Sequence, residues 1–126
     1  PKALAAAHLQ RAMVHTPLET LGFFSSVAST FGGIGQANYA AANAFLDACA
    51  LSRRLHGMIS STMQIPAVSE AGMSALTFSA AQLDEYGGIS LDEFAACMGA
   101  SLSIAHAAAE GTQAALVRVL LEGKHY

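Results

Sequence analysis

Tyr39 and Asn43 are four positions apart in a stretch that is predicted to be helical, so their side chains share one face. Ser25 and Ser26 stand at the end of a predicted strand. Ligands of open parallel sheets bind at the carboxyl ends of the strands, which would bring a hydroxyl, a phenol and an amide together. A phenol can donate a proton there, and a hydroxyl can polarise a carbonyl group. The same residues are also compatible with an ordinary helix and strand end that carry no chemistry.

The other reactive residue types form no recognisable site. Cys49 and Cys97 match no CxxC spacing, which favours two buried apolar thiols in a reducing compartment. The 5 histidines are scattered outside any HExxH motif, so no metal site is predicted. Of the 6 basic residues only Arg53 and Arg54 are adjacent, so no nucleic-acid partner is expected.

Composition places the chain among folded proteins and not among disordered ones. It has 126 residues, of which 53% are hydrophobic and 12% are charged, which suggests one domain or part of one. The charge content is about half that of a typical domain, which indicates either much buried surface per residue or an apolar face covered by something else. The uncharged stretch between Glu19 and Asp47 contains glycines and polar residues, so no membrane span is expected. The N-terminus does not resemble a signal peptide, and we expect a cytoplasmic location.

The elements that must position these residues alternate between helices and strands. Helices are predicted over residues 3–14, 36–56 and 91–109, strands over 21–28, 58–65 and 114–121, and a glycine-containing loop over 29–35. Gly57 is expected to end the long helix. Ser90 and Glu93 have the spacing of a capping box, as do Ser79 and Gln82. This alternation predicts an α/β fold with a parallel sheet.

The segment FFSSVASTFGGIGQANYAAANAFLDACALSRRLHG, residues 23–57, strongly resembles the active-site region of polyketide synthase ketoreductase domains. These domains belong to the short-chain dehydrogenase/reductase superfamily. The matching pattern is a strand ending in FSS, a GQxNY loop, a YAAANAFLDA helix and a basic pair. The resemblance implies a partial Rossmann-like three-layer fold that contains the last three parallel strands with flanking helices. Residues 1–126 would then form the C-terminal part of one ketoreductase domain.

The resemblance assigns a catalytic tetrad to this chain. The family tyrosine and asparagine correspond to Tyr39 and Asn43, and the family serine, thirteen positions before the tyrosine, corresponds to Ser26. The family lysine corresponds to Lys2, in the stretch PKAL. In such a site the phenol donates a proton and the nearby ammonium favours the phenolate form. The serine polarises the substrate carbonyl, and the asparagine holds a water molecule or the lysine.

The family further implies NADPH as cofactor and a β-ketoacyl thioester on an acyl carrier protein as substrate. It assigns cofactor contacts to Tyr39, Pro66, Ala67 and Val68. Ile65 stands where the family usually has a tryptophan, and the chain contains no GxGxxG fingerprint. The glycines at 32–35 do not replace that fingerprint, because they follow the serine strand. We therefore expect the nucleotide-binding N-terminal half to be absent from this chain and the chain alone to be inactive.

Several expectations about surfaces and partners follow. The first strand would lack a neighbour at one edge, with apolar surface exposed around Phe23 and Phe24. The remainder of the synthase, a complementing chain or a second copy would cover it. Residues 74–90 correspond to the family's substrate lid, with a plain surface helix as the alternative. Phe31 and Ala41 leave the stereochemical class open.

Two other functions stay open at this point. The chain is also compatible with a non-catalytic structural or interaction remnant of a reductase domain, which the missing tryptophan and nucleotide motif favour. A reductase of another branch of the superfamily is the second alternative. Most of that superfamily has a lysine four positions after the tyrosine, whereas this chain has Asn43 there.

Overall fold

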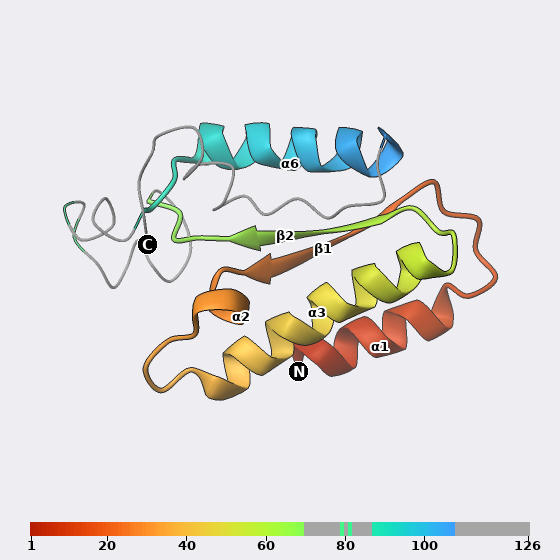
Figure 1. Ribbon diagram of the computed structural model, residues 1–126, viewed down its shortest axis with the longest axis horizontal. Coiled ribbons are helices and arrows are strands. Elements are labelled where there is room, and N and C mark those ends of the chain that lie inside the picture. Colours follow the sequence, from red (N-terminus) through yellow and green to blue (C-terminus); the bar gives the residue numbers. More distant parts are fainter. Residues whose placement is uncertain (70–78, 80, 82–86, 108–126) are drawn as a thin grey trace.

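The computed structural model describes residues 1–69, 79, 81 and 87–107 of the chain. Two parallel strands form the described sheet, and helices cover it on both sides (Figure 1). The elements are α1 (Lys2–Ala12), β1 (Leu21–Ser26), α2 (Ala28–Phe31), α3 (Ala37–Leu55), β2 (Ser60–Ile65) and α6 (Leu91–Ala107). The register pairs Leu21 with Ser60 and continues to Ser26 with Ile65. The predicted α/β class with parallel strands is confirmed.

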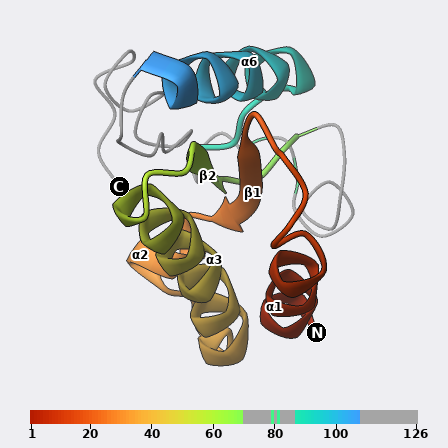
Figure 2. The same cartoon turned by 90° about the vertical axis from the view of Figure 1, so that its right-hand side faces the viewer.

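The sheet separates two helical layers (Figure 2). Helices α1 and α3 lie on one side, where Phe23 is buried with Ala6, Leu46 and Ala50. Helix α6 lies on the other side, where the Phe24 ring meets the Phe94 ring edge-on at a centroid distance of 6.0 Å. Successive strand residues point to opposite faces, so each phenylalanine serves a different layer. The expectation of exposed apolar surface is right for Phe24, which is 52% exposed, and wrong for Phe23.

The segment after β1 differs from the predicted loop. Residues 28–31 form the short helix α2, because Val27 already adopts helical backbone angles and its carbonyl accepts a hydrogen bond from the Phe31 amide at 2.9 Å. The helix stops at Gly32, whose φ of +74° few other residues adopt. Strand β2 begins at Ser60, two residues later than predicted. The predicted strand at 114–121, the Ser79–Gln82 capping box and most of segment 74–90 lie outside the described residues.

The ends of the long helices follow the predicted signals. Gly57 has a φ of +76° directly after α3, as expected of a glycine that ends a helix. At the start of α6 the Ser90 amide donates to Glu93 Oε2 at 2.7 Å, and the Glu93 amide donates to Ser90 Oγ at 3.2 Å. The Ser90–Glu93 capping box is therefore confirmed. Within the described part of the chain, no helix is long and apolar enough to cross a membrane.

The packing of α3 against β1 predicts that one leucine contributes strongly to the stability of the fold. Leu46 is buried in the core, whereas Leu55 on the same helix is 77% exposed. We expect Leu46→Ala to lower the free energy of unfolding by about 2–5 kcal/mol, because it leaves a cavity. Urea denaturation followed by circular dichroism measures this change. Leu55→Ala is the matched control, with an expected change within about 0.5 kcal/mol. Equal losses in the two variants would contradict this core.

Glu93 also acts on a thiol of α6. Burial, and then the negative charge of Glu93, raise the pKa of the Cys97 thiol. Glu93→Gln keeps a capping side chain and removes the charge, so the thiolate fraction of Cys97 at pH 8 increases. We expect alkylation by iodoacetamide to become about twofold faster, which matches a like-charge pair one helical turn apart. Peptide mass spectrometry separates Cys97 from Cys49, and an equal effect of Asp92→Asn would refute this coupling.

Candidate active site

Helices α1 and α3 lie side by side (Figures 1 and 2), and they bring Lys2, Tyr39 and Asn43 together. The Lys2 ammonium donates a hydrogen bond to Asn43 Oδ1 at 2.5 Å and lies 5.6 Å from the centroid of the Tyr39 ring. Asn43 is fully buried, and its Nδ2 donates to the Tyr39 carbonyl at 2.9 Å. The asparagine therefore holds the lysine on the same side of α3 as the phenol.

The packing of α1 on α3 fixes the place of Lys2. Ala6 of α1 is buried in the core, and Gln10 Nε2 donates to Cys49 Sγ of α3 at 3.2 Å. Because α1 is a regular helix, these contacts determine where its first turn lies. Tyr39 is 38% exposed, so its side chain is accessible to a ligand from outside.

Ser26 lies at the carboxyl end of β1 and is 8% exposed. Its hydroxyl accepts a hydrogen bond from the Ala28 amide at 3.2 Å. The preceding Ser25 points the other way and donates to the Asn43 carbonyl at 3.2 Å, as strand alternation requires. The structure thus brings three of the four predicted residues into contact. It places Ser26 at the adjoining strand end, without a hydrogen bond to the other three.

The predicted cofactor contacts follow the neighbouring strand end. Pro66, Ala67 and Val68 come directly after β2, and the Ile65 carbonyl accepts a hydrogen bond from the Val27 amide at 3.2 Å. The Ala67 carbonyl accepts a hydrogen bond from the Ile89 amide at 2.9 Å. This connection therefore lies at the same edge of the sheet as Ser26, the edge at which ligands of parallel sheets bind.

Sequence reasoning missed Asp47, which lies one turn after Asn43 on α3. Its carboxylate accepts hydrogen bonds from Ser29 of α2 and from Thr62 and Gln64 of β2. The only signal available in the sequence was the spacing of four that links Tyr39, Asn43 and Asp47.

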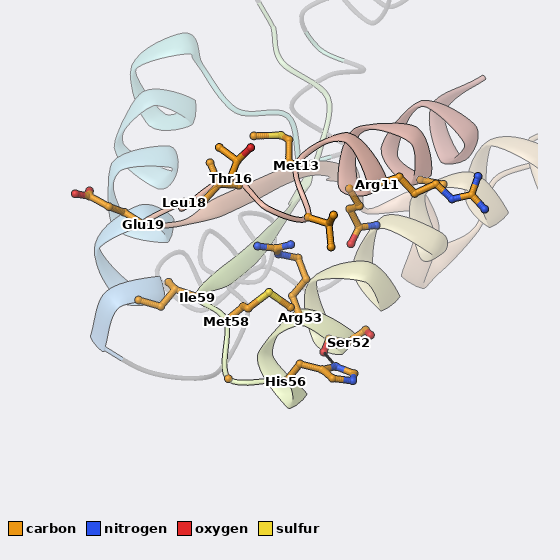
Figure 3. Close-up of a pocket in the computed structure, with 14 residues that line it drawn as sticks. Arg11, Met13, Thr16, Leu18, Glu19, Ser52, Arg53, His56, Met58 and Ile59 are labelled. Carbon is orange, nitrogen blue, oxygen red and sulfur yellow. Dashed lines mark hydrogen bonds between the residues drawn. The ribbon is translucent and has the colours of Figure 1, made fainter.

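A cavity of about 820 Å³ lies at the opposite end of the sheet (Figure 3). Leu18 and Ile59, which precede the two strands, line it together with Arg53 and His56 near the end of α3. The Arg53 guanidinium points into this cavity, and His56 Nδ1 contacts the Ser52 carbonyl at 2.7 Å. Lys2, Ser26, Tyr39 and Asn43 are not among its lining residues, so the cavity is separate from the candidate active site.

Comparison with known proteins gives this arrangement its context. The model of the KR domain matches residues 1–70. The chain belongs to the KR domain family. It is 49% identical over 72 residues to polyketide synthase GfsA of Streptomyces halstedii. The matched residues are 57% of this chain and 1% of that protein. It is 37% identical over 116 residues to polyketide synthase GfsB of the same organism, covering 92% of this chain and 2% of that protein.

Relatives from fungi and solved structures agree with this assignment. Hybrid PKS-NRPS synthetase pyvA of Aspergillus violaceofuscus is 41% identical over 75 residues, which are 60% of this chain and 2% of that protein. A structure described as A-type ketoreductases from a modular polyketide synthase matches with a TM-score of 0.57 and 29% identity. That match covers 92% of this chain and 21% of the solved chain. The predicted membership in the ketoreductase domains of the short-chain dehydrogenase/reductase superfamily, with a Rossmann-like fold, is therefore confirmed. The chain spans only 1–2% of the length of these synthases.

The contact between Lys2 and Asn43 predicts a marked loss of stability when the Asn43 side chain is shortened. We expect Asn43→Ala to lower the free energy of unfolding by about 1–3 kcal/mol, because the half-buried Lys2 ammonium and the Tyr39 carbonyl both lose a hydrogen-bond partner. Urea denaturation of the purified ketoreductase chain measures the loss. Asn38→Ala is the control, because Asn38 is exposed and water can replace its hydrogen bond, so a loss below about 1 kcal/mol is expected. Equal losses in the two variants would show that this contact is unimportant.

Proposed function

We propose that this ketoreductase chain supplies the catalytic residues for reduction of a β-ketoacyl thioester to the β-hydroxy form, with NADPH as cofactor and the substrate on an acyl carrier protein. The observation that carries the proposal is the Lys2 ammonium between Asn43 Oδ1 and the ring of a partly exposed tyrosine. The match to the KR domain family supports the same reaction class.

The residues fit the nicotinamide end of a dinucleotide better than its phosphates. Tyr39 is accessible, and the connection after β2 lies at the ligand-binding edge of the sheet. The chain has no GxGxxG to hold the pyrophosphate. When bound, NADPH supplies the hydride that is added to the carbonyl carbon.

The protein residues act on the carbonyl oxygen. The Ser26 hydroxyl donates a hydrogen bond to this oxygen, which stabilises the negative charge that develops there. The Tyr39 hydroxyl donates its proton to the same oxygen, so the ketone gains one hydride and one proton and becomes an alcohol. The nearby Lys2 ammonium stabilises the phenolate that remains, and Asn43 keeps Lys2 in place.

We also propose that this chain acts together with a nucleotide-binding half of a ketoreductase domain, within a synthase in the cytoplasm. Two observations support this. The sequence lacks the dinucleotide fingerprint, and the relatives are large polyketide synthases. In the described sheet, β1 pairs with β2 alone, so a further strand can be added at its other edge.

The first test is a calorimetric titration of the 126-residue chain with NADPH. We expect no saturable binding at millimolar cofactor, because the pyrophosphate site is missing from the sequence. The nucleotide-binding half of a related ketoreductase domain, added as a separate chain, is expected to restore binding. Saturable binding by the chain alone would overturn the requirement for a second half.

The complemented protein then tests the chemistry. NADPH oxidation at 340 nm with a β-ketoacyl thioester is expected to fall about 10²- to 10⁴-fold in Tyr39→Phe, because the proton donor is lost. Ser26→Ala is expected to lower the rate of NADPH oxidation similarly. Ser52→Ala, near the separate cavity, is the serine control. Unchanged rates in Tyr39→Phe would refute the assigned role. No reduction by the complemented unaltered chain would instead favour the non-catalytic interaction remnant.

A further inference from the structure

A polar cluster around Asp47 connects three elements beside the candidate active site. Asp47 Oδ2 accepts hydrogen bonds from Ser29 Oγ at 2.7 Å and Gln64 Nε2 at 2.8 Å. Asp47 Oδ1 accepts one from Thr62 Oγ1 at 2.7 Å. Thr62 and Gln64 are buried, so these hydrogen bonds cannot be exchanged freely for water. Bonds to an ionised carboxylate are about twice as strong as neutral ones.

The cluster reaches the segment that follows the catalytic serine. Ser29 Oγ lies 2.9 Å from the Ser26 carbonyl, and it also accepts a hydrogen bond from Gln64 Nε2 at 2.7 Å. The next residue, Thr30, donates through Oγ1 to Gln64 Oε1 at 2.8 Å. Two consecutive side chains of α2 are thereby fixed to α3 and β2.

Helix α2 depends on these contacts for its position. It has four residues and no side-chain hydrogen bond at its N-cap, and so short a helix is not stable by itself. The Ala28 amide at its start is the group that donates to Ser26 Oγ. Any displacement of α2 therefore changes the hydrogen bond that orients the serine hydroxyl.

We propose that Asp47 is a positioning residue for Ser26, acting through Ser29 and α2 in the ketone reduction. This inference rests on the proposed function. The two carboxylate oxygens of Asp47 bind different partners and should therefore affect Ser26 differently. Oδ2 leads through Ser29 to Ser26, whereas the partner of Oδ1 is Thr62, whose hydroxyl donates to Asp47 and not to α2. Ser29→Ala removes the bond to Oδ2 together with the bond that Ser29 accepts from Gln64, and Thr62→Ala removes the bond to Oδ1. Only the first variant should disturb Ser26.

Amide resonances of the ¹⁵N-labelled 126-residue chain test this link without an activity assay. Ser29→Ala and Asp47→Asn are expected to shift the Val27 and Ala28 resonances. They should also speed hydrogen exchange at Ala28 about tenfold, the equilibrium effect of losing one hydrogen bond. Thr62→Ala, and the surface variant Asp92→Asn, should leave both signals in place.

The outcomes separate a positioning role from general loosening. Equal disturbance of Ala28 by Ser29→Ala and Thr62→Ala would overturn the inference, because the two oxygens would then be equivalent. An unchanged Ala28 signal in Ser29→Ala would overturn it too. If Asp47→Asn fails to fold, the comparison of Ser29→Ala with Thr62→Ala still decides the question.

A kinetic measurement on the complemented protein follows. We expect Ser29→Ala to lower kcat about 10- to 100-fold at unchanged KM for NADPH, since small misplacements of a catalytic group have effects of this size. Thr62→Ala should keep the unaltered kcat. A kcat unaffected by Ser29→Ala would overturn the catalytic consequence. No reduction by the unaltered chain would overturn the proposed function itself, and the resonance experiment would still decide the structural link.

Discussion

The packing of α1 along α3 is the constraint on which the candidate active site depends. It brings the ammonium of Lys2 to Asn43 across 41 positions of sequence. Neither helix alone can hold that cation beside a phenol, because the lysine side chain is long and loses much rotamer freedom when fixed. The apolar contacts of Ala6 and Leu46 with Phe23 offset this cost, so a hydrophobic core beneath the site supports its electrostatics.

One face of α3 carries both candidate catalytic residues and a residue that supports the neighbouring elements. Tyr39, Asn43 and Asp47 follow one another at intervals of one turn, and their surroundings change from partly exposed to buried or half-buried. The first contributes the phenol, the second holds the ammonium, and the third collects hydroxyl and amide donors from two other elements. Buried polar groups of this kind are costly unless they are all partnered, and Thr62 and Gln64 of β2 supply two of the partners of Asp47.

Residue patterns were sufficient to predict the long elements, whereas the tetrad was assigned from the family resemblance and stays a prediction. The ends of α1 and α3 and the start of α6 lie within two residues of their expected positions, because helix formers and end signals such as Gly57 and Ser90 mark them. Helix α2 was missed, since four residues are too short to show a helical period. Strand alternation places Phe23 and Phe24 on opposite faces of the sheet. Tertiary packing decides that the face of Phe23 is the buried one and that Phe24 is exposed. The hydrogen bonds of the Asp47 cluster join residues 15 to 35 positions apart, and no local pattern shows them.

The position of Lys2 also joins the two helices electrostatically. Its ammonium donates to Asn43 Oδ1 and lies 5.6 Å from the centroid of the Tyr39 ring, so two groups of α3 attract the same cation of α1. A cation over an aromatic ring is attracted by the negative face of that ring by about 0.5–1 kcal/mol at exposed sites. The side chain at this end of α1 is therefore a cross-link to α3, beside the apolar contact that Ala6 makes in the core.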